Sequence, residues 1–118
     1  MKLRIQSGSI RLRLKQAEVR ALAEGGEVIE NCPTLPVPLT YSLRPSAATT
    51  LSASNDGGSL TIDIPSAWLR GWETDARVGF ESNEGGLHVL IEKDWKCTNP
   101  SDPKDNEDCF ENPEPQCT

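Results

Sequence analysis

Regular alternation of apolar and polar residues is the feature that most limits the fold of this 118-residue chain. In residues 3–5 and 10–14 every second residue is aliphatic, and a Ser-Gly pair at 7–8 separates the two runs. Alternation with period two predicts strands that bury one face. A short glycine turn between two such runs predicts a β-hairpin, and the second face of this hairpin is basic.

The same signals recur along the chain as far as residue 92. They predict further strands at residues 27–30, 39–43, 49–53, 60–64, 77–81 and 87–92. Glycine-rich turns at 55–58 and 83–86 join the last four strands into two hairpins. Prolines within residues 32–38 make that segment a loop or a sheet edge.

Two segments have a helical pattern instead. Residues 16–24 are rich in helix-favouring Ala, Glu and Leu, and Val19 and Leu22 share one helical face before Gly25. A second short helix is predicted to begin after Pro65, with Leu69 and Trp72 facing the core. The chain is therefore predicted to be mainly β with two short helices, which is the α+β class.

The two halves of the chain align at a fixed offset of 50 residues. Apolar positions coincide between residues 9–31 and 59–81, and four residues are identical: Ser9/Ser59, Ala17/Ala67, Arg20/Arg70 and Val28/Val78. Repeats at 1–46 and 47–94, each ordered ββαββ, would build a duplicated, pseudo-two-fold barrel of swapped hairpins. Two unrelated hairpin–helix units that happen to align would give the same pattern, so both interpretations stay open.

The second half resembles the AbrB-type swapped-hairpin unit. The matching residues are Ile64-Pro65, Leu69, Arg77-Val78, Gly85-Gly86 and Leu87-His88-Val89. The resemblance implies that two such units in one chain would be similar to the homodimer of AbrB-like proteins. It also implies a hairpin that grips DNA through basic residues.

The whole chain resembles a family of small bacterial proteins without an assigned function. Shared residues at the start are Met1-Lys2-Leu3-Arg4-Ile5, Ser9 to Leu14, Gln16, Glu18-Val19, Leu22 and Gly25-Gly26. Shared residues at the end are Ile91 to Trp95, Cys97, Glu107-Asp108, Phe110 and Asn112-Pro113. The resemblance implies a bacterial source and no particular activity.

Charge divides the chain into a body, residues 1–97, and an acidic, proline-rich tail, residues 98–118, that packs on the body or stays mobile. The net charge of −6 disfavours nucleic acid and anionic membranes as partners. No apolar run is long enough to span a membrane, and no apolar leader follows the charged start. We therefore expect a cytoplasmic protein whose four cysteines are mostly reduced.

A ligand or partner surface is predicted where the tail meets the basic hairpin. Its residues are Lys2, Arg4, Arg11, Arg13 and Asp94. Clustered fixed positive charge suits phosphate groups, but the matching hairpin of the second half offers Asp56, Thr61 and Asp63. A solvated strand face and a dock for the acidic tail are the alternatives.

Tail thiols and carboxylates form a second candidate site. Cys97, Cys109, Glu107 and Asp108 could hold a divalent metal such as zinc, although no Cys-x-x-Cys pair is present. His88 could contribute a further ligand, and a Cys97–Cys109 disulfide is a rival state. Free thiols and no cofactor are the expectation.

No nucleophile elbow, phosphate loop or paired-carboxylate motif occurs in the sequence. We therefore expect a non-enzymatic binding or regulatory module that takes an unknown protein or a small ligand. Two other classes remain, an AbrB-like DNA-binding regulator and a metal- or thiol-dependent protein. A monomer and a homodimer are both compatible with the sequence.

Overall fold

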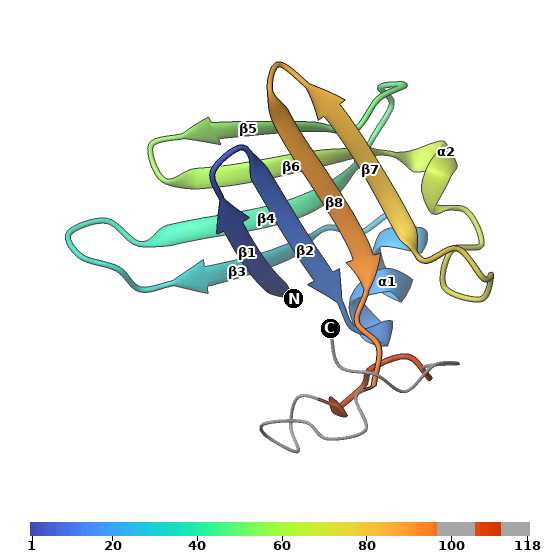
Figure 1. Cartoon of the computed structure of the whole chain (residues 1–118). Helices are drawn as coiled ribbons and strands as arrows, with labels where there is room; N and C mark the ends of the chain where they lie inside the picture. Colours follow the sequence, from blue (N-terminus) through green and yellow to red (C-terminus); the bar gives the residue numbers. More distant parts are fainter. Residues whose placement is uncertain (97–105, 112–118) are drawn as a thin grey trace.

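The computed structural model describes residues 1–96 and 106–111 (Figure 1). In this part of the chain the elements follow in the order β1 (Lys2–Gln6), β2 (Ser9–Leu14), α1 (Gln16–Ala23), β3 (Val28–Cys32), β4 (Leu39–Ser46), β5 (Ser52–Asp56), β6 (Ser59–Pro65), α2 (Ser66–Leu69), β7 (Gly79–Glu84) and β8 (Leu87–Lys93). The predicted class, mainly β with two short helices, is confirmed. Neither helix has the length and the apolar composition needed to cross a membrane.

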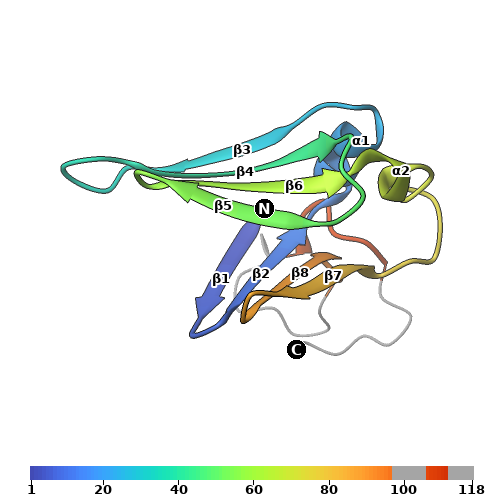
Figure 2. The ribbon, with the colours of Figure 1, turned by 90° about the horizontal axis from the view of Figure 1, so that it is seen from above.

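The strands form two four-stranded sheets, with the orders β1-β2-β8-β7 and β3-β4-β6-β5. The sheets lie face to face with their strands crossing, and both helices lie at the same end of the two layers (Figures 1 and 2). The two sheets do not close into the predicted barrel. Each sheet keeps two edge strands, because every strand pairing within the described residues joins members of one sheet.

Each sheet contains two hairpins joined by one parallel pair. Strand β2 pairs with β8, which places Ser9 beside His88 and Arg13 beside Glu92. Strand β4 pairs with β6 in the same way. Each sheet therefore takes one hairpin from residues 1–46 and one from residues 47–94. Origin of the halves by duplication stays a prediction.

The core fills the space between the sheets, as the alternation predicts. Leu12 and Leu14 of β2 meet Ile62 and Ile64 of β6 and Ile91 of β8 in one cluster of buried side chains. Burial of each such side chain contributes about 1.5–3 kcal/mol to folding. Arg11 and Arg13 alternate with these leucines on β2 and point outward. One face of β2 is therefore apolar and the other is basic.

Helix α1 closes one end of the core with Val19 and Leu22. Glu18 Oε1 accepts a hydrogen bond from the backbone N–H of Lys15 at 2.9 Å, which satisfies one donor at the helix start. Helix α2 is a single short turn that ends at Leu69. Trp72 lies beyond it, fully buried, and its indole nitrogen donates to the carbonyl of Arg77 at 3.0 Å.

Residues 106–111 pack against the end of β8 and the start of α1. Phe110 pairs with Trp95 in an isolated bridge, and their ring centroids are 5.8 Å apart. The N–H of Phe110 donates to the carbonyl of Asp94 at 2.9 Å. This segment therefore pairs with the residues that follow β8, and the side chain of its Cys109 is fully buried.

Candidate binding site on the basic face

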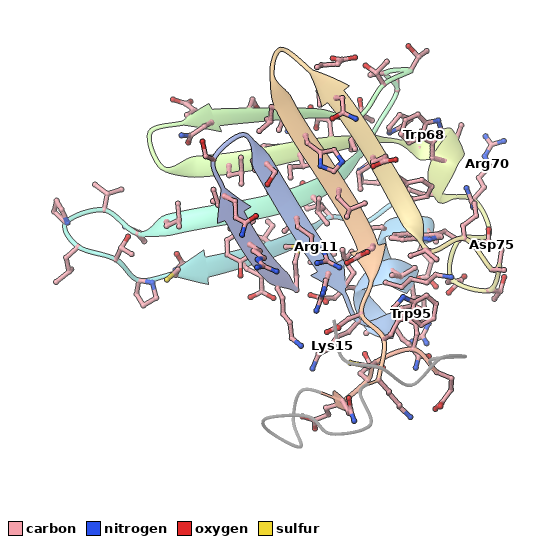
Figure 3. All side chains as sticks on the ribbon, viewed as in Figure 1. Arg11, Lys15, Trp68, Arg70, Asp75 and Trp95 are labelled. Atoms are coloured by element: carbon pink, nitrogen blue, oxygen red, sulfur yellow. The ribbon has the colours of Figure 1, made fainter. Side chains whose placement is uncertain are left out.

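The outer surface of the sheet β1-β2-β8-β7 is basic over β1 and β2. Lys2 lies opposite Arg13, and Arg4 lies opposite Arg11, in the antiparallel register. Opposite residues project from one face of a sheet, and this face points away from the core because Leu12 points into it. We call Lys2, Arg4, Arg11 and Arg13 the basic face; Arg11 is labelled in Figure 3.

Glu92 of β8 neutralises part of the basic face. Its Oε1 accepts hydrogen bonds from Arg11 Nε at 2.5 Å and from Arg13 Nε at 3.3 Å. The residue is only 9% exposed, so one buried carboxylate holds two guanidinium groups. The parallel pairing of β2 with β8 creates this contact, and sequence alternation alone did not identify Glu92.

Asp94 was predicted at the meeting point of body and tail, and it lies directly after β8 with 3% exposure. Its Oδ2 is 3.1 Å from Lys2 Nζ. This oxygen nevertheless accepts no hydrogen bond from the residues that the structure describes, so the contact with Lys2 is electrostatic rather than directed. The Asp94 carboxylate also interacts with the buried thiol of Cys109 and raises the pKa of that thiol.

A shallow hollow of about 180 Å³ opens over β1, β2 and β8 beside the basic face. Its lining residues are Arg4, Gln6, Ser9, Ile10, Arg11, His88 and Leu90. Guanidinium groups bind carboxylates and phosphates in bidentate fashion, and hydroxyl and amide groups add further hydrogen bonds. The hollow thus has the chemistry of an anion site.

Two side chains that line the hollow, His88 and Arg4, differ in whether they already have a charged partner. His88 Nε2 lies 2.9 Å from Glu81 Oε2 on the neighbouring strand β7. Arg4, in contrast, makes no ion pair, hydrogen bond or aromatic contact within residues 1–96 and 106–111. Its guanidinium is therefore available to an incoming anion. The contribution of Ser9, Gln6 and His88 was missed, because only the three-strand arrangement brings them together.

The predicted metal residues do not form a cluster in the described residues. Cys97 lies outside them, Glu107 is exposed, and Cys109 is fully buried. The side chain of Asp108 accepts a hydrogen bond from the N–H of Ala17 at 3.0 Å. Within residues 1–96 and 106–111 no group of three or more His, Cys, Asp or Glu side chains could hold a metal ion. The metal and the Cys97–Cys109 disulfide stay predictions.

Burial changes the acid–base properties of two nearby groups. Burial first, and the Asp94 carboxylate second, raise the pKa of Cys109 from 9.0 to about 11. Lys93 is 2% exposed, and burial lowers its pKa. Cys109 is therefore a protonated, unreactive thiol at neutral pH.

Lys93 and the segment around Asp75 form a second polar cluster; Asp75 is labelled in Figure 3. Lys93 Nζ donates to the carbonyl of Asp75 at 2.7 Å and lies 5.0 Å from the ring centre of Phe110. Arg77 donates to the carbonyl of Trp68 at 2.7 Å. These bonds use backbone acceptors, so the cluster fixes the connection between α2 and β7.

Comparison with curated proteins gives no match. Comparison with solved structures gives none either. A family model matches residues 1–114, nearly the whole chain, and the protein therefore belongs to a family of unknown function, DUF7009.

Proposed function

We propose that this protein is a non-enzymatic binding module whose basic face takes an acidic segment of a partner protein. A bacterial, cytosolic setting is part of the proposal. The observation that carries it is the opposition of Arg4 and Arg11 across β1 and β2, with Arg4 unpaired in the described residues.

Like charges directly opposite each other destabilise a sheet, by about 0.2–1 kcal/mol per pair. The basic face has two such pairs in succession, Lys2 with Arg13 and Arg4 with Arg11. Glu92 balances Arg11 and Arg13 from the neighbouring strand. Arg4 receives no such compensation, and a ligand carboxylate beside it would relieve the repulsion.

The test measures binding of a fluorescein-labelled oligoglutamate peptide by fluorescence anisotropy at low and at high salt. Each charge-assisted hydrogen bond contributes about 1.5–3 kcal/mol, so Arg4→Gln is expected to weaken binding about tenfold. The matched control is Arg44→Gln, because Arg44 is also an outward strand arginine but is paired with Asp63 on the other sheet. Equal affinity of the two variants, or no binding by the native chain, would refute the proposal.

An AbrB-like DNA-binding regulator is the second candidate. The interlocking of hairpins from both halves within each sheet favours it. The outer face of β6 opposes it, because Thr61 and Asp63 stand where β2 has Arg11 and Arg13. Salt-sensitive retention of duplex DNA that is lost when Arg11 and Arg13 are both changed to Glu would select this candidate instead.

A further inference from the structure

Among the residues that the structure describes, β1 lies at the edge of its sheet. It pairs with β2, and no other strand in the described residues pairs with it. Half of the backbone N–H and C=O groups of an edge strand point away from its partner and can accept another strand. Ile5 of β1 is 60% exposed, so this edge also presents apolar surface.

An apolar groove lies beside the inner face of β1, between the two sheets. It has a volume of about 250 Å³ and is lined mainly by Leu3, Ile5, Ile10, Leu39, Leu60 and Leu87, with Ser54 and Asn55 as polar lining. A water molecule takes about 30 Å³, so the groove has room for aliphatic side chains. Leu39 and Leu60 come from the second sheet, which makes the groove a property of the sandwich.

The two faces of β1 therefore offer different chemistry to a strand added at its edge. Arg4 and Lys2 point outward, whereas Leu3 and Ile5 point toward the groove. Successive side chains of a strand alternate between the two faces of a sheet. A partner strand that suits both faces must alternate acidic and aliphatic residues.

We propose that the edge of β1 binds an extended partner segment with alternating acidic and aliphatic side chains. Its backbone pairs with β1, a carboxylate beside Arg4 pairs with that guanidinium, and its aliphatic side chains enter the groove. This inference rests on the proposed function and adds the partner's conformation and sequence pattern. Recognition by strand addition takes affinity from the backbone and specificity from alternate side chains.

Charge argues against a second copy of the chain as the occupant. Pairing of β1 with β1 of another copy would place Lys2 and Arg4 close to the same cations of the second strand. Such like-charge pairs are destabilising. An acidic strand would instead place carboxylates beside Lys2 and Arg4, and such opposite-charge pairs are stabilising.

The experiment compares two short peptides of equal composition by calorimetry on the full chain. One alternates Glu and Val, and the other has all Glu residues before all Val residues. We expect the alternating peptide to bind at least tenfold more tightly. Hydrogen exchange should then show alternate β1 amides slowed at least tenfold by this peptide.

Variants separate the contributions of the two faces. Ile5→Ser is expected to weaken binding of the alternating peptide at least fivefold and to leave binding of oligoglutamate unchanged. The matched control is Ile29→Ser, because Ile29 also lies on an edge strand and is 56% exposed. This control should bind both peptides as the native chain does.

Three outcomes would overturn the inference. Equal binding of the two peptides, with sensitivity to Arg4→Gln alone, would leave the proposed function intact and exclude strand addition. A dimer in sedimentation velocity that Ile5→Ser dissociates would make a second copy the occupant. Absence of binding by either peptide and by oligoglutamate would remove the inference together with the proposed function.

Discussion

Arg11 Nε lies 2.5 Å from Oε1 of Glu92, across the parallel pair formed by β2 and β8. The same carboxylate oxygen holds Arg13. We predict that Glu92→Gln lowers the free energy of unfolding by about 2 kcal/mol, because two largely covered guanidinium groups lose their shared counter-charge. Urea denaturation measures this loss.

The control for Glu92 is Asp63→Asn on the other sheet. Asp63 pairs with Arg44 at the matching position of the parallel pair β4 and β6, but the Arg44 side chain is 54% exposed. An exposed pair contributes about 0.5 kcal/mol. Equal losses in the two variants would show that burial of the Glu92 contact is unimportant.

Gly79 pairs with Glu92 from the other side, at the start of β7. A β-carbon at this position would overlap the carbonyl oxygen of Ile91 and lie 2.7 Å from the Cα of Glu92. Because these are backbone atoms, the strands must separate, and we predict that Gly79→Ala costs about 3 kcal/mol or more. Thermal unfolding monitored by circular dichroism tests this.

Gly26→Ala provides the comparison. Gly26 lies in the loop after α1, and a β-carbon there would lie 3.1 Å from the carbonyl oxygen of Ala21. We expect it to cost less than about 1 kcal/mol. A melting temperature of Gly79→Ala equal to that of Gly26→Ala would contradict the close approach of β7 and β8.

Local sequence patterns predicted the hairpins and the two faces of their strands. Alternation in β1 and β2 depends only on neighbouring residues, so the outward position of Arg4 and Arg11 followed directly from it. Glycine turns placed the starts of β6 and β8 to within one residue. Strand β5 begins at Ser52 rather than at residue 49, because residues 47–50 bend before pairing begins.

Contacts between distant segments could not be predicted. Nothing in the sequence near residue 92 indicates that β8 runs parallel to β2. The contact of Glu92 with the arginines of β2, and the position of His88 beside Ser9, therefore could not be predicted. Barrel closure is likewise decided by pairing between sheets and not by local alternation. Lys93 is buried only because Asp75 and Phe110 supply partners from elsewhere in the chain.

Asp108 caps the start of α1 from the C-terminal segment. Its Oδ2 accepts from the N–H of Ala17, and its backbone carbonyl accepts from the N–H of Gln16, both at 3.0 Å. Its φ is +56°, a conformation that Asp and Asn tolerate better than Ala. We predict that Asp108→Ala costs about 1.5 kcal/mol in urea denaturation, through loss of the cap and backbone strain.

Asp108→Asn keeps the acceptor and tolerates the same φ, so its loss should stay below about 0.5 kcal/mol. Glu107→Ala serves as the control because Glu107 is exposed next to Asp108. If Asp108→Ala is no less stable than Glu107→Ala, the cap on α1 does not form.

Cys109 makes stability depend on pH in the alkaline range. The unfolded thiol ionises around its ordinary pKa of 9.0, whereas in the folded protein burial and Asp94 raise the pKa to about 11. Between these values the unfolded chain loses a proton that the folded chain retains. The contribution of the protonated thiol is therefore complete below pH 9 and is lost as the pH rises to about 11, with a total on the order of 2 kcal/mol.

The measurement is urea denaturation of the native chain and of Cys109→Ala from pH 8 to pH 11.5, because the difference between the two profiles cancels other titrating groups. We expect the advantage of the native chain over Cys109→Ala to shrink between pH 9 and 11. Cys32→Ala is the control, since Cys32 is exposed and its removal should leave the profile unchanged. A constant difference across this range would mean that the Cys109 thiol ionises equally easily in the folded and unfolded chain, and that residues 106–111 do not bury it beside Asp94.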